Sequence, residues 1–153
     1  MQTTAPLYQT DFYAWTRYQA QLLRNEELEK LDLANLAEEI EDMGKSEQRE
    51  LENRLVVLLR HLLKLAVLPN SLPARGWRLT IKEQRQQLRR LFKKNPSLRA
   101  LLPDSLDELY SDARELAVDD LLIDNLSPNR VLPLQCPFTL DQILDAAFFP
   151  AWP

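Results

Sequence analysis

The chain has 153 residues, of which 45% are hydrophobic and 27% are charged, and its formal net charge is −4. This composition is ordinary for a soluble globular protein, and the length is enough for one domain that buries its own core. Two glycines are too few for the turns and bulges of a sheet protein, so the composition argues against a β fold and favours helices joined by short loops.

Three features bear on the compartment. Cys136 is the single cysteine of the sequence, which excludes an intrachain disulfide and a zinc cluster. The longest apolar stretch, residues 55–68, contains Arg60 and Lys64 and is too short and too charged to span a bilayer. The first twelve residues lack the basic start and apolar run of a signal peptide. We therefore predict a reduced, cytoplasmic protein with no membrane attachment.

The first half of the chain predicts three helices. The first follows Thr10 as N-cap and runs to about Arg24. The second follows Asp32 as N-cap and ends at Gly44, because glycine is favoured just after a helix C-terminus. Ser46 caps the third, whose wide apolar face is typical of the central helix of a bundle. The apolar faces predicted for the three helices are Phe12, Trp15, Tyr18 and Leu22; Leu33, Leu36, Ile40 and Met43; and Leu51, Leu55, Leu58, Leu59, Leu62 and Ala66.

Prolines delimit the next two helices. Pro69 ends the third helix, and the fourth covers residues 77–95 and ends before Pro96, since the residue before a proline avoids the helical region. A short helical turn over residues 96–102 leads to the fifth helix, whose first position suits Pro103. The inner faces predicted for these helices are Trp77, Ile81, Leu88, Leu91 and Phe92, and then Leu106, Leu109, Tyr110, Ala113 and Leu116.

The C-terminal part is less regular. Residues 124–137 contain three prolines and no periodicity, so we expect a loop, and Thr139 caps a last short helix. No segment alternates apolar and polar residues with the period of a strand. We predict a single all-α domain over residues 1–153. Its core is an antiparallel bundle of about five to six helices with short loops, flanked by an N-terminal arm (1–9) and an aromatic tail (148–153).

Four motifs, in order along the chain, resemble one bacterial family, that of domain of unknown function 29. They are DFYAWT (11–16), LDLANLAEEIEDMGKSE (31–47), RGWRLTIKEQR (75–85) and CPFTLDQILD (136–145). The resemblance extends from about Tyr8 to Pro150. It implies a helical fold and no established activity, and it supplies no catalytic residue to carry over.

The carboxylates near the start of the second motif do not form a metal-binding pattern. Glu38 and Asp42 lie on the side of the helix opposite the predicted apolar face. A carboxylate-bridged metal pair in a bundle needs inward carboxylates and Glu-x-x-His pairs, but Leu58 stands three residues before His61, the one histidine. We interpret these carboxylates as a solvated helix face and predict no metal and no cofactor.

The sequence contains no convincing catalytic group. His61 lies at the edge of an apolar face with no carboxylate one turn away on its own helix. A pair with Cys136, as base and nucleophile, is not required by any spacing. We interpret His61 as structural and Cys136 as a small buried apolar residue, and we regard an enzyme as the less favoured class.

The charge is divided unevenly along the chain. Residues 75–99 contain nine Lys or Arg and one acid, whereas the remaining chain contains ten basic and twenty-two acidic residues. Four cations spaced four, three and four residues apart form one row, here called the basic ridge: Arg78, Lys82, Arg85 and Arg89. We expect the basic ridge to face solvent or an interface.

Three interpretations of the basic ridge remain open. It binds the phosphates of a nucleic acid, it docks on an acidic protein, or it pairs with the acidic helix 33–43 of the same chain. The third is favoured, and the overall acidity argues against nucleic acid.

The tail has two interpretations of equal weight. Its aromatic residues, Phe148, Phe149 and Trp152, either cover the core as a lid or form an exposed patch that docks a partner or a second copy. Two functions therefore remain. The favoured one is a non-enzymatic module for protein–protein interaction or oligomerisation, and the alternative is a nucleic-acid-associated protein that uses the basic helix 75–95.

Overall fold

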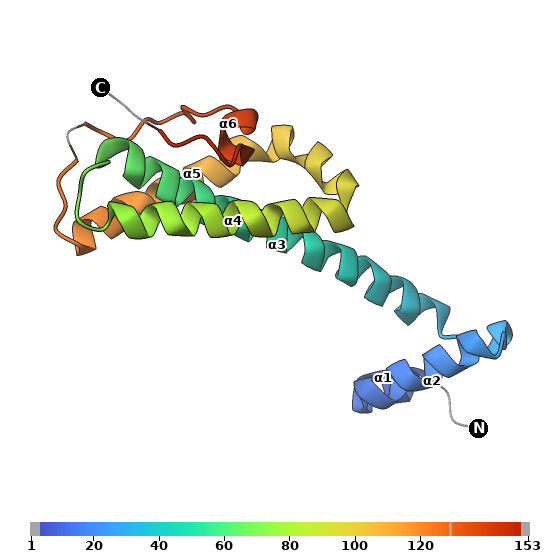
Figure 1. Ribbon diagram of the computed structural model, residues 1–153. Coiled ribbons are helices and arrows are strands. Elements are labelled where there is room, and N and C mark those ends of the chain that lie inside the picture. The colour runs from blue at the N-terminus through green and yellow to red at the C-terminus, as the bar shows by residue number, and fades with distance from the viewer. Residues whose placement is uncertain (1–3, 129, 151–153) are drawn as a thin grey trace. The chain divides into compact units, whose positions relative to one another are not determined.

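The computed structural model describes residues 4–128 and 130–150, and within these residues the regular structure is entirely helical (Figure 1). The prediction of an all-α protein is confirmed. The helices are α1 (Thr4–Thr10), α2 (Phe12–Arg24), α3 (Leu33–Val67), α4 (Ala74–Lys94), α5 (Leu102–Ile123) and α6 (Leu140–Leu144), with short 3₁₀ helices η1 (Leu28–Lys30) and η2 (Pro96–Leu101). The chain divides into two compact units, here called the N-terminal unit (1–46) and the C-terminal unit (47–153).

The N-terminal unit begins with two short helices in place of an arm and one helix. The Asp11 side chain accepts a hydrogen bond of 3.0 Å from the backbone N–H of Ala14 and so caps α2. Thr10 is the last residue of α1, and the prediction that it caps the following helix is wrong by one residue. A carboxylate is the stronger acceptor at the positive end of a helix, which favours Asp11 in this role.

The core of the N-terminal unit is small. Trp15 is buried beside the rings of Tyr8 and Phe12, at centroid distances of 4.8 and 5.7 Å. Its Nε1 donates a hydrogen bond of 3.1 Å to the carboxylate of Asp32, just before α3. The Tyr8 hydroxyl donates a hydrogen bond of 2.5 Å to Glu39 on α3, which raises the pKa of Tyr8 to about 12. These polar contacts connect α1 and α2 to the first part of α3.

Helix α3 runs from Leu33 to Val67 without a break, so the prediction of two helices meeting at Gly44 is wrong. Gly44 does not have the positive φ that a terminating glycine adopts. Good helix formers lie on both sides of it, and an interior glycine costs only about 1 kcal/mol relative to alanine. One glycine is therefore too weak a signal to interrupt this helix.

The C-terminal unit is built around α3 from residue 47 onward, α4 and α5, which succeed one another along the chain in antiparallel directions (Figure 1). Among its described residues, twenty-four buried apolar ones fill its core. The predicted inner face of α4 is confirmed for Trp77, Ile81 and Leu88. On α5 the prediction is wrong for Leu116, which is 37% exposed, because the inner face advances from Ala113 to Ala117.

The segment after α5 is held by side chains rather than by regular structure. The Tyr110 hydroxyl donates a hydrogen bond of 2.5 Å to the carbonyl of Pro133, and the Arg114 guanidinium donates to the carbonyls of Leu132 and Pro133. The prediction that Thr139 caps the last helix is confirmed, since Thr139 forms a complete capping box on α6. Irregular backbone in this segment is thus fixed against α5.

Candidate interaction surfaces

The basic ridge does not face solvent as one row. Lys82 and Arg89 are exposed, as predicted. Arg78 is partly buried, with its guanidinium carbon 5.3 Å from the ring centre of Phe149. Arg85 is 2% exposed, so the prediction that it faces solvent or an interface is wrong.

Arg85 holds the C-terminal segment of its own chain. Its Nε donates a hydrogen bond of 2.8 Å to the carbonyl of Ile143, Nη1 one of 2.6 Å to Phe148, and Nη2 one of 3.1 Å to Gln142. Two of these carbonyls belong to the end of α6, where a helix leaves its acceptors unpaired. Burial lowers the pKa of Arg85, while Asp145 opposes that change. The side chain therefore acts as a clamp on the segment that covers this side of α4.

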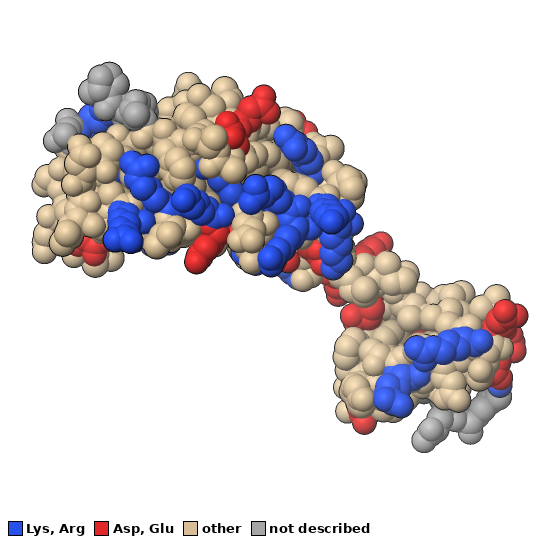
Figure 2. All heavy atoms as spheres, in the orientation of Figure 1, with Lys and Arg blue, Asp and Glu red and all other residues tan. Residues whose placement is uncertain are grey.

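Exposed cations in and just after α4 form a band on one face of the C-terminal unit. Figure 2 shows Lys and Arg side chains gathered across this unit, along the line of α4 in Figure 1. The exposed members between residues 75 and 99 are Arg75, Lys82, Arg89, Arg90, Lys93, Lys94 and Arg99. Here they are called the basic face. Such a stripe attracts anionic partners over a distance set by the ionic strength.

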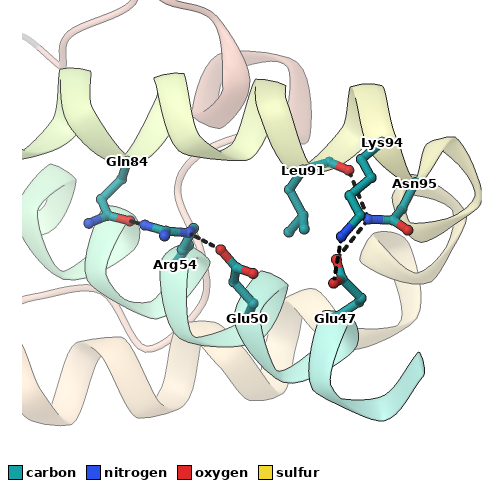
Figure 3. A network of polar contacts seen from close by, with 7 residues as sticks. All are labelled: Glu47, Glu50, Arg54, Gln84, Leu91, Lys94 and Asn95. Carbon is teal, nitrogen blue, oxygen red and sulfur yellow. Dashed lines mark hydrogen bonds and ion pairs between the residues drawn. The ribbon is translucent and has the colours of Figure 1, made fainter. Parts of the chain in front are cut away.

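One end of the basic face is tied to α3 by a polar network (Figure 3). Glu47 accepts hydrogen bonds from Lys94 Nζ at 3.1 Å and from Asn95 Nδ2 at 2.8 Å. Further along α3, Arg54 donates from Nε to Glu50 at 3.0 Å and from Nη1 to Gln84 at 3.3 Å. Residues 47–54 of α3 therefore share charge and hydrogen bonds with α4. The predicted pairing of α4 with the acidic residues 33–43 stays a prediction.

The described part of the aromatic tail packs on its own unit. Phe148 and Phe149 are partly buried against the core, and Phe148 contacts the ring of Phe138 at a centroid distance of 6.1 Å. Phe149 lies under the guanidinium groups of Arg78 and Arg85. Trp152 lies outside the described residues. For Phe148 and Phe149 this geometry favours the lid over the docking patch.

A cleft of about 280 Å³ opens between α4, η2 and α6. Two exposed arginines, Arg89 and Arg99, line it together with Asp141 and Asp145 from the last helix. The remaining lining residues are Arg85, Leu88, Phe92 and Leu144. Three arginines and two aspartates therefore line the cleft, so charges of both signs meet there.

A partly buried ionic cluster centred on Asp120 was not predicted from the sequence. The carboxylate accepts hydrogen bonds from Arg60 through Nε, at 2.6 Å, and Nη2, and from Lys64 Nζ at 2.8 Å. These contacts lower the pKa of Asp120 to about 2 and raise that of Arg60. Lys64 is 5% exposed and lies 5.1 Å from the ring centre of Trp77. A lysine within the apolar face of α3 was the available signal, since a buried cation requires a partner.

The single histidine and the single cysteine have separate backbone partners. His61 Nδ1 donates a hydrogen bond of 2.7 Å to the carbonyl of Val57, and burial lowers the pKa of the ring. The Cys136 thiol donates to the carbonyl of Phe138 at 3.4 Å, and burial raises its pKa. Neither contact is that of an activated nucleophile with its base. Within the described part of the chain, no three His, Cys, Asp or Glu side chains are placed to hold a metal ion.

The N-terminal unit exposes an unusual amount of apolar surface for its size. Among residues 7–46, three are buried: Trp15, Gln19 and Leu22. Eight large apolar side chains are exposed: Phe12, Tyr13, Tyr18, Leu23, Leu28, Leu33, Ile40 and Met43. The predicted burial of Leu33, Ile40 and Met43 is therefore wrong, at exposures of 68%, 65% and 67%. The periodicity identified an apolar face correctly, but in this structure that face is uncovered.

No helix among the described residues is both long and apolar enough to cross a membrane. The family model for the domain of unknown function DUF29 matches residues 7–149. Among crystal structures, an alpha-helical protein of unknown function from Rhodospirillum rubrum is similar, with 26% identity and a TM-score of 0.66. The similarity covers 92% of this chain and 90% of that one. No curated protein matches the chain.

Proposed function

The chain belongs to the DUF29 family, as its four motifs indicated, and we propose that it is a non-enzymatic module that binds protein through its N-terminal unit. The observation that carries this proposal is the ratio of exposed to buried apolar side chains. Among the residues whose burial is described, the N-terminal unit exposes eight large ones and buries two apolar residues, whereas the larger C-terminal unit exposes eight and buries twenty-four. Large exposed apolar patches on a soluble protein mark interaction sites.

The residue types support a protein partner. Tyr, Phe and Met are enriched in the centres of protein interfaces. Phe12, Tyr13 and Met43 are exposed in this unit, and the guanidinium of exposed Arg17 lies 5.8 Å from the ring centre of Tyr13. A surface of this kind combines apolar anchors with a polar rim, which is the usual anatomy of a protein–protein contact.

A second candidate function is binding of nucleic acid through the basic face. The observation in its favour is the row of exposed cations along α4, since Lys and Arg clustered on one helix are the electrostatic footprint of a phosphate-binding surface. The net charge of −4 for the whole chain argues against it. We therefore rank it second.

Site-specific photo-crosslinking in the native cells tests the first proposal. A photoreactive amino acid replaces exposed Tyr13 or Tyr18 in the N-terminal unit, and the matched control replaces exposed Leu134 in the C-terminal unit. We expect a discrete crosslinked protein from the first two positions and none from the third. Crosslinks at Leu134 alone, or at no position, would overturn the proposal.

A further inference from the structure

We infer that the partner of the first part of α3 is a second copy of this chain, bound antiparallel about a two-fold axis. This inference rests on the proposed function and names its partner. It concerns one face of α3, here called the α3 stripe: Leu33, Ala37, Ile40 and Gly44. These residues are spaced four, three and four apart, so they lie along one side of the helix. All four are exposed.

Gly44 has no explanation within its own unit. Its φ is not positive, so the backbone does not require glycine. A Cβ built on it would meet no heavy atom within 4 Å in the described chain outside its own helix and its chain neighbours. Glycine within a helix is destabilising relative to alanine, so a glycine here is accounted for only if something needs the space above the backbone. A helix from another molecule that packs closely at Gly44 would use that space.

The α3 stripe is complementary to itself when the helix direction is reversed. Its residues alternate large and small: Leu33, Ala37, Ile40, Gly44. If two copies pair antiparallel about a point midway between residues 38 and 39, Leu33 of each copy lies opposite Gly44 of the other. Ile40 then lies opposite Ala37. Large side chains facing small ones interdigitate, and a two-fold axis makes both halves of the contact equivalent. An unrelated partner would not require this symmetry of the sequence.

Surface area and charge bear on the strength of this pairing. Of the eight exposed apolar side chains of the N-terminal unit, Leu33 and Ile40 belong to the α3 stripe. The stripe is therefore smaller than a stable interface, which buries about 800 Å² per partner, and the dimer is a weak, reversible one. The α3 stripe itself contains no charged residue. Glu38 and Glu41 lie towards one edge, and the two-fold axis brings the equivalent edges together. Added salt should therefore strengthen the dimer by screening their repulsion.

Sedimentation of the full-length chain at several protein concentrations tests the inference. We expect a reversible dimer, and we expect Gly44→Leu to raise its dissociation constant by roughly tenfold to a hundredfold, because the new side chain collides with Leu33 of the other copy. The matched control is Gly76→Leu, at the other helical glycine, which is also exposed and has open space around it. It should leave the dissociation constant unchanged. A monomer at all concentrations, or a dimer that Gly44→Leu does not weaken, would overturn the inference.

Disulfide crosslinking tests the direction of the helices. In a Cys136→Ser background, the double variant Leu33→Cys/Gly44→Cys should form a covalent dimer on mild oxidation. The single variants should not, since equal positions 33 lie eleven residues apart along the paired helices, about 16 Å. Dimers from the single variants would show a parallel pairing and overturn the inference. The photo-crosslinks described above separate the two proposals, because a crosslink to a different protein supports the proposed function and contradicts this partner.

Discussion

Arg85 donates a hydrogen bond of 2.6 Å to the backbone carbonyl of Phe148, 63 residues further along the chain. Two more bonds from the same guanidinium reach Ile143 and Gln142. One buried cation thus satisfies three carbonyls of the C-terminal segment and holds it against α4. The planar guanidinium is suited to this geometry, since its donors are fixed relative to one another.

Replacement of Arg85 by Gln is expected to lower the free energy of unfolding by about 3 kcal/mol, because buried carbonyls lose their donors. Amide hydrogen exchange should show residues 140–150 opening in the variant. Equilibrium unfolding in urea measures the first effect. The control is Arg89→Gln, one turn away and exposed, which should change the free energy by less than about 0.5 kcal/mol. Equal effects at both positions would contradict the clamp.

The error at Arg85 shows what periodicity leaves out. The spacing of Trp77, Ile81 and Leu88 identified the inner face of α4, and the structure buries all three. Arg85 lies at the edge of that face, where a helical wheel predicts solvent. It is buried because α6 covers that edge, and α6 comes nearly sixty residues later in the chain. The local sequence pattern specifies which residues share one face of a helix, whereas the burial of that face depends on which other segments pack against it.

Asp120 should make the protein sensitive to acid. Its pKa is lowered from 3.8 to about 2 in the folded chain, chiefly by the hydrogen bonds from Arg60. Because the pKa of Asp120 is lower in the folded than in the unfolded chain, its ionised carboxylate stabilises the fold by about 2 kcal/mol at pH values above about 4. This contribution is lost as the pH falls from about 4 to about 2. The variant Asp120→Asn should lack that part of the acid-induced loss.

Urea unfolding of both proteins, followed from about pH 5 to about pH 2, measures the difference. The variant should also be less stable at neutral pH, since Lys64 stays buried without its carboxylate. The neighbouring exposed residue supplies the control, Asp119→Asn, which should retain the acid sensitivity of the original chain. If Asp120→Asn and the original chain lose stability in parallel down to about pH 2, the cluster does not have this role.

The basic face gives a separate prediction for the second candidate function. The triple variant Lys82→Gln/Arg89→Gln/Lys93→Gln neutralises exposed residues only, and it spares Arg78 and Arg85, which hold the C-terminal segment. If the basic face binds a DNA duplex, the triple variant should bind more weakly. The slope of the logarithm of the binding constant against the logarithm of the salt concentration should also become shallower, by roughly one for each cation that touches a phosphate. Fluorescence anisotropy across a salt series measures both.

A matched variant separates a specific face from general charge. Arg24→Gln/Lys45→Gln/Arg49→Gln removes three exposed cations that lie outside α4. It should leave DNA binding and its salt dependence nearly unchanged. Equal losses in the two triple variants would show that no particular face is used and would remove the second candidate.

The apolar faces illustrate a second limit of sequence analysis. Leu33, Ile40 and Met43 have the spacing of buried residues, and the prediction of a packed helix followed from it. In the structure they are exposed, while Leu51 and Leu55 of the same helix are buried. The first half of α3 has a narrower apolar face than the second half, but the spacing of its apolar residues is equally helical, and spacing does not show whether another segment covers a face. The exposure of Leu33, Ile40 and Met43 is the reason to expect a partner that covers them.

Gly44→Ala should stabilise the isolated chain, because the residue is helical, its Cβ meets open space, and alanine is favoured over glycine within helices by about 1 kcal/mol. Urea unfolding at protein concentrations where the monomer dominates measures this gain. Gly76→Ala, in the first turn of α4, is the control and should gain less, since helix ends depend less on propensity. A destabilised Gly44→Ala monomer would mean that α3 needs glycine at this position for its own backbone. In that case Gly44 would be explained by its own helix, and no second copy would be needed to account for it.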